Sequence, residues 1–253
     1  TWYFGSGELT GSSASGGEAY YGGNGIYKSV DGGLSWDSLA VTATNTNGFD
    51  SNFDFIWNVK TDPSNDSLDV VYAAVYSAIY RSENGGNSWV KVLGGGSAYY
   101  TNVEVTSTGV VYATLSSDGT DKGIWRSLDG QNWTNITDSL FTPVYGRIAI
   151  GVNPADEDEV YFLAAETDGY GQHTDVFFNG ETWTSLWKYN ANTTVWNDIS
   201  LNIPANQNSS FDNFNAQGGY DLLVKVHPDN QNTVYIGGTN LWRSTDGFST
   251  PNN

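Results

Sequence analysis

The residues of this chain that could do chemistry are first of all its carboxylates. Of 253 residues, 28 are Asp or Glu and 10 are Lys or Arg, which gives a net charge of −18 at neutral pH. A glycoside hydrolase needs only two carboxylates at a suitable separation. Their spacing in the sequence selects no pair, so solvated loop charge is the alternative interpretation. The candidates lie between the apolar segments, at Glu8, Glu18, Asp50, Asp54, Asp138, Glu166, Asp168, Asp175, Glu181 and Asp212.

Aromatic side chains between the apolar segments form a second candidate group. Phe, Trp and Tyr make up 15% of the chain. Flat rings beside Asn, Asp and Gln can stack on sugars while the polar groups bond to sugar hydroxyls. The alternative is that these rings only pack the loops onto the scaffold. The residues predicted to contact a ligand are Tyr99, Tyr100, Phe141, Tyr170, Phe177 and Phe178.

Few residues suit metal or thiol chemistry. Without cysteine the chain has no disulfides, thiolate ligands or cysteine nucleophiles. His173 and His227 lie far apart in the sequence. The acid-rich stretches 62–69 and 153–159 could bind calcium through oxygen ligands, but neither matches an EF-hand loop. We therefore expect no metal and no cofactor, with calcium as the alternative.

The acidic charge also excludes classes of partner. Binding to nucleic acid or to anionic lipid needs clustered Lys and Arg, which are scarce here. The apolar runs are too short to span a bilayer, so we expect no membrane insertion. The chain has no methionine, even at position 1, and we expect it to be a mature piece of something longer.

A repeat organises the elements that must position these residues. Five segments share the pattern of an aliphatic residue, an aromatic residue, Lys or Arg and, in four of them, Ser. Their starts are 45 to 62 residues apart, and they lie at 26–29, 79–82, 124–127, 186–189 and 241–244. A second strand precedes each of them, at 2–4, 71–73, 111–113, 160–162 and 234–236. An alternating run precedes the last four of these second strands, at 56–60, 103–106, 148–152 and 222–226.

Each unit thus contains four short strands, here called A to D, with D following the repeat segment. Periods of this size with four strands per unit indicate the blades of a β-propeller, an all-β fold of four-stranded antiparallel sheets. We predict a single propeller segment over residues 1–253, with the first and last blades incomplete, from a larger propeller of seven or more blades. A β-helix is the alternative. The five units lie approximately at 1–41, 55–93, 101–136, 146–200 and 220–253.

The turn between strands C and D carries a motif. The stretch 29–36, SVDGGLSW, has the spacing S-x-D-x-G-x-x-W, in which a short carboxylate accepts turn amides and glycine supplies a positive φ. The pattern resembles the Asp-box, or bacterial neuraminidase, repeat, whose motif is structural in sialidases, sortilin-type receptors and xyloglucan-degrading glycosidases. The matching residues are Ser29, Asp31, Gly33, Trp36, Ser82, Asn84, Gly86, Trp89, Ser127, Asp129, Trp133, Ser244 and Asp246.

The resemblance is also to secreted propellers of Bacteroidetes exported by the type IX system. It carries three functional interpretations. The first is a secreted or cell-surface adhesin, non-catalytic, that binds a glycan or a surface protein. The second is the propeller part of a xyloglucanase-like glycoside hydrolase with catalytic carboxylates partly outside these residues. The third is a sortilin-like or assembly-factor scaffold.

Two further expectations follow, one from the positions of the arginines and one from the order of the strands. A sialidase grips its substrate with three arginines, but of the four arginines here three occupy the same repeat position, so a sialidase is excluded for these residues. In antiparallel blades the A–B and C–D turns share one end, and the B–C and D–A connections share the other. The long connections all belong to the second set, so we expect function at that end. Besides a glycan or a surface protein, we expect the chain to contact the remaining blades of its own full-length protein.

Overall fold

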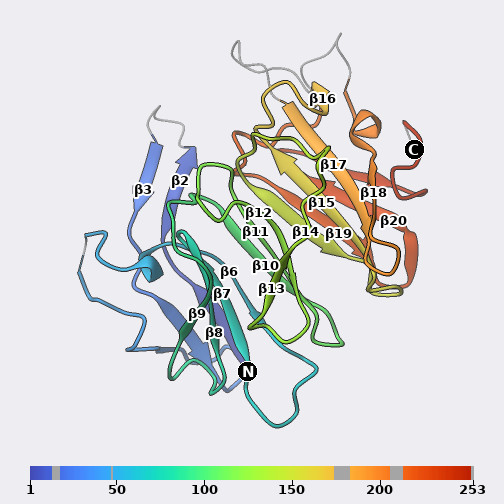
Figure 1. Cartoon of the computed structure of the whole chain (residues 1–253). Helices are drawn as coiled ribbons and strands as arrows, with labels where there is room; N and C mark the ends of the chain where they lie inside the picture. The colour runs from blue at the N-terminus through green and yellow to red at the C-terminus, as the bar shows by residue number, and fades with distance from the viewer. Residues whose placement is uncertain (13–17, 47, 174–182, 206–212, 252–253) are drawn as a thin grey trace. The chain divides into compact units, whose positions relative to one another are not determined.

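The computed structural model describes residues 1–12, 18–46, 48–173, 183–205 and 213–251 (Figure 1). Their regular structure is β apart from two short 3-10 helices, η1 (Asn52–Asp54) and η2 (Ser200–Asn202). None of the helices in these ranges is long and apolar enough to cross a membrane. The chain divides into two compact units, unit 1 (Thr1–Ile136) and unit 2 (Thr137–Asn253).

Unit 1 contains three antiparallel sheets and a hairpin. Sheet 1 is β1 (Trp2–Gly5), β4 (Ile26–Ser29) and β5 (Asp37–Ser38). Sheet 2 is β6 (Ile56–Thr61), β7 (Val71–Val75), β8 (Ala78–Ser82) and β9 (Val90–Gly94). Sheet 3 is β10 (Thr101–Val105), β11 (Val111–Leu115), β12 (Gly123–Ser127) and β13 (Trp133–Asn135). In Figure 1 the hairpin, β2 (Glu8–Ser12) with β3 (Glu18–Tyr21), extends away from these sheets.

Unit 2 contains two further antiparallel sheets. Sheet 4 is β14 (Ile148–Val152), β15 (Glu159–Ala165), β17 (Trp183–Asn190) and β18 (Val195–Asp198). The short strand β16 (Gln172–His173) pairs with the first residues of β17. Sheet 5 is β19 (Leu223–His227), β20 (Asn230–Gly237) and β21 (Leu241–Ser244).

The predicted all-β architecture of four-stranded antiparallel blades is confirmed. Among the described residues, sheet 1 has no A strand and sheet 5 has no D strand, as the repeat pattern indicates. Three strands were not predicted: β2, β3 and β16 lie in connections whose Gly, Ser and polar residues hide any strand pattern. That residues 1–253 form a single propeller segment stays a prediction.

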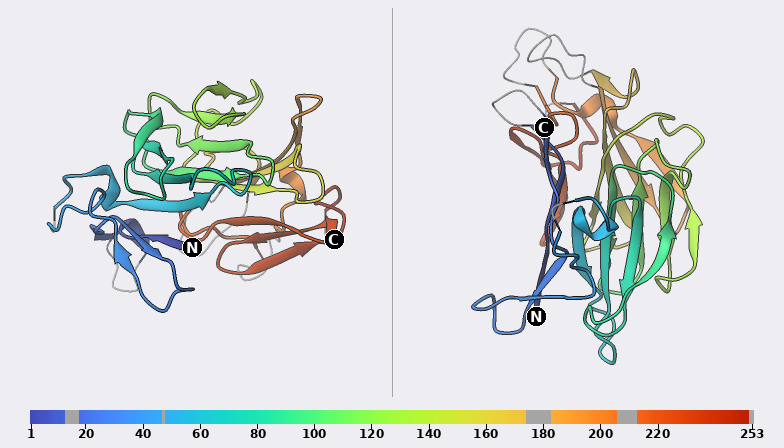
Figure 2. Two further views of the ribbon diagram at one scale, coloured as in Figure 1. Left: turned by 90° about the horizontal axis from the view of Figure 1, so that it is seen from below. Right: turned by 90° about the vertical axis from the view of Figure 1, so that its left-hand side faces the viewer.

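The cores of both units lie on the second strands of their sheets. All five residues of β7 and of β11 are buried, as expected for strands that are covered on both faces. The first strands of neighbouring sheets lie side by side: Asn58 of β6 donates to the Val103 carbonyl of β10 at 2.9 Å. The two views in Figure 2 show the strands of sheets 2 and 3 running next to one another.

The repeated cation of strand C packs on a tyrosine of strand B. Arg81 Nε donates to the Tyr72 hydroxyl at 3.1 Å, and Arg126 Nε donates to the Tyr112 hydroxyl at 3.2 Å. Lys188 lies 5.5 Å from the centre of the Tyr161 ring. These cations are therefore engaged within their own sheets.

Candidate functional site

The turns that join strands C and D hold the residues of the predicted Asp boxes. In sheet 1 the Ser29 hydroxyl oxygen accepts the Gly33 amide at 2.8 Å. The Asp31 carboxylate accepts both the amide and the hydroxyl of Ser35, at 3.0 and 2.6 Å. The Trp36 indole N–H donates to the Gly33 carbonyl at 3.1 Å. The motif residues thus bond to one another inside the turn.

The turn in sheet 2 repeats this geometry with an amide in place of the carboxylate. Ser82 Oγ accepts the Gly86 amide at 2.9 Å, and Asn84 Oδ1 accepts the Ser88 amide at 2.9 Å. The Trp89 indole N–H donates to the Gly86 carbonyl at 3.0 Å. An acceptor oxygen at this position is therefore sufficient for the turn, and a negative charge is not required.

The turn in sheet 3 is one residue shorter. Ser127 Oγ accepts the Gly130 amide at 2.8 Å, and Asp129 accepts the amides of Gln131 and Asn132 at 2.9 and 2.7 Å. Trp133 makes no closing bond like those of Trp36 and Trp89: its indole N–H is buried and has no partner within the described part of the chain.

The last turn, in sheet 5, has a phenylalanine where the others have glycine. The Phe248 amide donates to Ser244 Oγ at 2.8 Å, and Phe248 adopts a φ of 56°. Asp246 accepts the Thr250 amide at 3.1 Å. Phe248 is buried in the core of unit 2, which offsets the cost of the left-handed backbone.

Hydrogen bonds within the turns set the ionisation of two of these aspartates. Bonds from Ser35 hold the pKa of Asp31 well below its ordinary value, and bonds from Asn132 do the same for Asp129. Both carboxylates are exposed and already saturated with donors. These two carboxylates therefore stabilise their turns and are poorly suited to transferring protons.

A row of aromatic rings lies at the other end of the sheets of unit 1, on the B–C and D–A connections. Phe49 meets Tyr76 at 5.0 Å between ring centres, and Tyr76 meets Tyr99 at 5.8 Å. The row continues from Tyr99 to Tyr100 at 6.5 Å, and from Tyr100 to Trp57 at 4.9 Å. Phe49 and Tyr99 are exposed by 46% and 47%, while the other three rings are half-buried. Phe49 and Tyr99 are thus accessible to a ligand, and their contacts with the half-buried rings of the row hold them in place.

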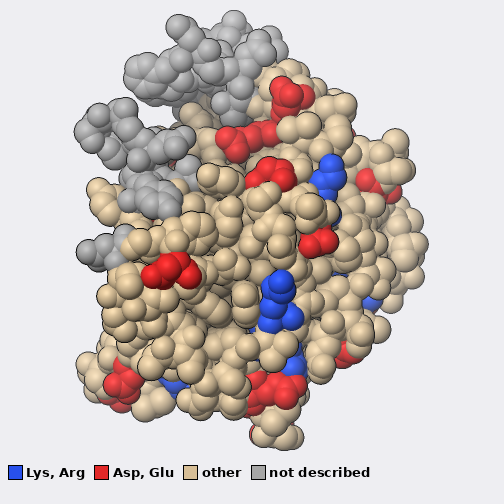
Figure 3. Space-filling view, turned by 60° about the vertical axis from the view of Figure 1, so that its left-hand side comes forward, with Lys and Arg blue, Asp and Glu red and all other residues tan. Residues whose placement is uncertain are grey.

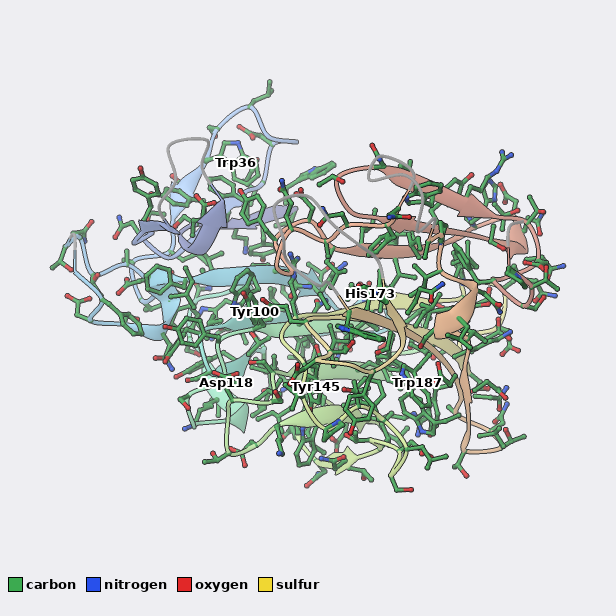
Figure 4. The ribbon with its side chains drawn as sticks, turned by 90° about the horizontal axis from the view of Figure 1, so that it is seen from above. Trp36, Tyr100, Asp118, Tyr145, His173 and Trp187 are labelled. Carbon is green, nitrogen blue, oxygen red and sulfur yellow. The ribbon has the colours of Figure 1, made fainter. Side chains whose placement is uncertain are left out.

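Asp118 holds Tyr99 in place. The Tyr99 amide donates to the Asp118 carboxylate at 3.1 Å, and the Ser116 hydroxyl donates to the same carboxylate. The Trp57 indole N–H donates to the Tyr99 carbonyl at 2.8 Å. The loops also touch at Gly119, where an added Cβ would lie 2.7 Å from the Ala98 Cβ. Figure 4 labels Tyr100 and Asp118 on these loops.

A buried carboxylate organises the connection that carries Phe49. Asp54 has no exposed surface and accepts the amides of Asp50 and Ser51, both at 2.9 Å. The Ser51 side chain and Asp54 form a capping box at η1. Phe49 also packs edge-to-face on buried Phe55 at 5.1 Å. Asp54, one of the ten candidate carboxylates, therefore serves the loop itself.

The other predicted ligand residues lie in unit 2 and differ in accessibility. Phe141 is only 5% exposed and packs on Tyr145 and Trp187, so its ring contributes to the core of the loop instead of facing a ligand (Tyr145 and Trp187 are labelled in Figure 4). Tyr170 is 48% exposed. Phe177 and Phe178 lie outside the described residues.

Three residues of the aromatic row, Phe49, Trp57 and Tyr76, were not among the ligand residues predicted from the sequence. Trp57 belongs to β6, and Tyr76 to the tight turn between β7 and β8. Trp57 falls at a strand position where an aromatic residue is expected to pack the sheet. A signal existed for Tyr76, because it occupies a B–C connection, the set that was expected to carry function.

The described carboxylates and histidines are also potential metal ligands. No group of three or more His, Cys, Asp or Glu side chains within the described ranges could bind a metal ion. His227 Nδ1 accepts the Asp229 amide at 3.1 Å in a turn, and His173 stacks on Trp183. On the face shown in Figure 3, Asp and Glu side chains are scattered among uncharged ones.

Among the candidate carboxylates whose side chains the structure describes, Asp50 and Glu166 have shifted pKa values. Hydrogen bonds from Thr46 and Thr44 lower the pKa of Asp50, whereas burial raises the pKa of Glu166. Asp175, Glu181 and Asp212 lie outside the described residues. Among the described candidates, Glu166 therefore differs from the others in having a pKa that is raised by burial.

Comparison with known proteins finds sequence similarity to xyloglucanases. No family model matches the chain. A xyloglucanase of Hypocrea jecorina is 23% identical over 211 residues, which are 72% of this chain and 25% of that protein. The chain thus spans about a quarter of the length of this relative.

Solved structures show the same fold. The GH74 enzyme of Niastella koreensis superposes with a TM-score of 0.63 and 18% identity, over 91% of this chain and 34% of that one. The GH74 xyloglucanase of Xanthomonas campestris gives a TM-score of 0.60 and 16% identity, over 90% and 34%. The β-propeller fold is thereby supported independently of the repeat pattern.

Proposed function

We propose that this chain is the propeller part of an extracellular glycoside hydrolase that binds a polysaccharide, with xyloglucan as the first substrate class to test. The observation that carries the proposal is the aromatic row of unit 1, which includes the exposed rings of Phe49 and Tyr99. Exposed rings fixed by a packed base bind sugar faces with little loss of side-chain freedom.

The similarity to xyloglucanases supports the hydrolase over the adhesin. The non-catalytic adhesin, the first interpretation from the sequence, has less support than its alternative. An extracellular location accompanies the proposal because a polysaccharide substrate lies outside the cell. Assignment to the Asp-box repeat rests on the turn geometry of Ser29, Asp31 and Gly33 and of the matching turns. Export by the type IX system stays a prediction.

Binding of polysaccharides to the purified chain tests the proposal. We expect xyloglucan to retard the protein in affinity electrophoresis. Tyr99→Ala and Phe49→Ala should each weaken this retention roughly three- to tenfold, because one ring contact contributes about 0.5–1.5 kcal/mol. Trp2→Ala is the matched control, because Trp2 is 62% exposed but lies at the Asp-box end of β1, opposite Ser29. Release of reducing sugar from xyloglucan and arabinan tests hydrolysis in parallel.

Two results would contradict the proposal. In the first, the protein is retarded by none of the polysaccharides. In the second, Trp2→Ala weakens retention as much as Tyr99→Ala does, which would mean that binding does not use the long-connection end.

A further inference from the structure

Three long connections of unit 2 converge on the side chain of Glu166. Glu166 follows directly after β15. A Cβ added to Gly146, in the connection before β14, would lie 2.2 Å from its Oε2 atom. A Cβ added to Gly218, in the connection before β19, would lie 3.6 Å from Oε1. Each carboxyl oxygen therefore faces a glycine that belongs to a different loop.

The carboxyl group of Glu166 is partly screened from water and has no partner among the described residues. In the described part of the chain, Glu166 makes no hydrogen bond and no ion pair, and burial is the cause that raises its pKa. The residue as a whole is nevertheless exposed, so a ligand can reach it. Partial desolvation of a carboxyl group without an internal donor costs stability, and a ligand that supplies donors recovers it.

The backbone of the turn is constrained around this group. Glu166 and Asp168 adopt φ values of 57° and 40°, which are costly for residues other than glycine. The Tyr170 amide donates to the Thr167 carbonyl at 3.1 Å, and the Thr167 hydroxyl donates to the Tyr170 carbonyl at 2.5 Å. These bonds fix the turn that carries both Glu166 and the exposed ring of Tyr170.

The neighbouring loop is fixed by Arg147. Its Nη1 atom donates to the carbonyls of Gly219 and Tyr220, at 3.2 and 2.8 Å. The Tyr220 side chain is 41% exposed. Two accessible tyrosines are therefore held by hydrogen-bonded backbone: Tyr170 in the connection of Glu166 itself, and Tyr220 in the connection that contains Gly218.

We propose that Glu166, with Tyr170 and Tyr220, forms a contact site in unit 2 for a neutral saccharide. Vicinal hydroxyl groups of a sugar supply the donors that the carboxylate lacks, and tyrosine rings stack on sugar faces. A metal ion is a poorer fit, because the described residues gather no further acidic or histidine ligands around Glu166. This inference rests on the proposed polysaccharide function and adds a site separate from the aromatic row.

Three variants of the chain test the site with xyloglucan and with arabinan as probes. Glu166→Gln keeps the shape of the side chain but removes two acceptor sites, and Glu166→Ala removes the group. Gly146→Ala leaves Glu166 in place and displaces its carboxyl group. We expect each variant to weaken binding about tenfold or more, as hydrogen bonds to a charged group of about 1.5–3 kcal/mol imply. Asp168→Asn is the control, because it removes one charge from the same turn.

The outcomes separate this site from the proposed function. Weaker binding in the three variants, at unchanged melting temperature for Glu166→Gln and with Asp168→Asn behaving like the natural protein, supports the site. Unchanged binding in Glu166→Gln and Glu166→Ala overturns it, and if Tyr99→Ala still weakens binding the proposed function stands. If the natural protein binds neither probe, both proposals fail.

Discussion

A methyl group on Gly130 would lie 1.8 Å from the hydroxyl oxygen of Tyr72, so the C–D turn of sheet 3 closes directly over a tyrosine of sheet 2. The relationship recurs in unit 2, where a Cβ on Gly247 would lie 2.7 Å from the Tyr161 hydroxyl. In both pairs the tyrosine belongs to strand B and the glycine to the turn of the following sheet. The glycine of this turn therefore serves the packing of neighbouring sheets as well as the turn itself.

Gly130→Ala should destabilise the chain more than Gly32→Ala. Both glycines have a positive φ, of 69° and 76°, and either alanine costs about 1–3 kcal/mol for the left-handed backbone. Only Gly130 meets a neighbour, because a Cβ on Gly32 has nothing within 4 Å. Overpacking against the buried Tyr72 ring adds about 1–3 kcal/mol. Urea denaturation of both variants measures the difference.

The double variant Gly130→Ala with Tyr72→Phe isolates the contact. Removing the hydroxyl should recover part of the loss in stability, beyond the sum of the two single changes. Equal destabilisation by Gly130→Ala and Gly32→Ala would show that the hydroxyl moves aside at no cost.

Asp31→Asn should make stability less sensitive to acid. The folded-state pKa of Asp31 is lowered, so its contribution is complete above the ordinary aspartate value near 4 and is lost as the pH falls towards the folded value. Asparagine should keep the turn, because Asn84 Oδ1 accepts the Ser88 amide in sheet 2 as the Asp31 carboxylate accepts the Ser35 amide. Urea midpoints from pH 7 to pH 2 should fall less steeply in the variant, and parallel curves for the two proteins would contradict this.

The strands could be predicted from the sequence because two signals coincide there. Segments such as 71–75 and 79–82 combine apolar residues with a repeated position for the aromatic residue and the cation. The packing of Arg81 on Tyr72 explains why that pair recurs. Strands β2, β3 and β16 carry no such repeat, and their pairing comes from loop geometry that local composition does not indicate.

The candidate sites could be predicted only in part. Tyr99 and Tyr100 were selected because they lie in a connection, but the row needs Trp57 and Tyr76, which only the fold brings beside them. Glu166 was one of ten equivalent carboxylates in the sequence. What distinguishes it is the approach of Gly146 and Gly218 from other loops, a long-range property that no local motif encodes.

Asp54→Ala should destabilise unit 1 and loosen the connection that carries Phe49. The change leaves the partly buried amides of Asp50 and Ser51 without their acceptor, at a cost of about 1–3 kcal/mol. Urea denaturation measures the loss, and limited proteolysis within residues 41–55 reports the loosening. Asp50→Asn is the control: Asp50 is exposed and accepts a bond from the Thr46 hydroxyl. Similar losses in both variants would mean that burial of Asp54 is not the cause.

Asp118→Ala should weaken polysaccharide binding while changing stability little. The Asp118 carboxylate is exposed, and its bond to the Tyr99 amide fixes the backbone that presents the Tyr99 ring. Without it the ring samples more orientations, and binding should weaken roughly two- to tenfold, from about 0.5–1.5 kcal/mol of ordering cost. Affinity electrophoresis on xyloglucan measures the effect. Asp121→Asn removes a charge from the same loop without touching Tyr99 and should bind normally. If Asp118→Ala also binds normally while Tyr99→Ala does not, the ring alone, and not its anchoring, determines affinity.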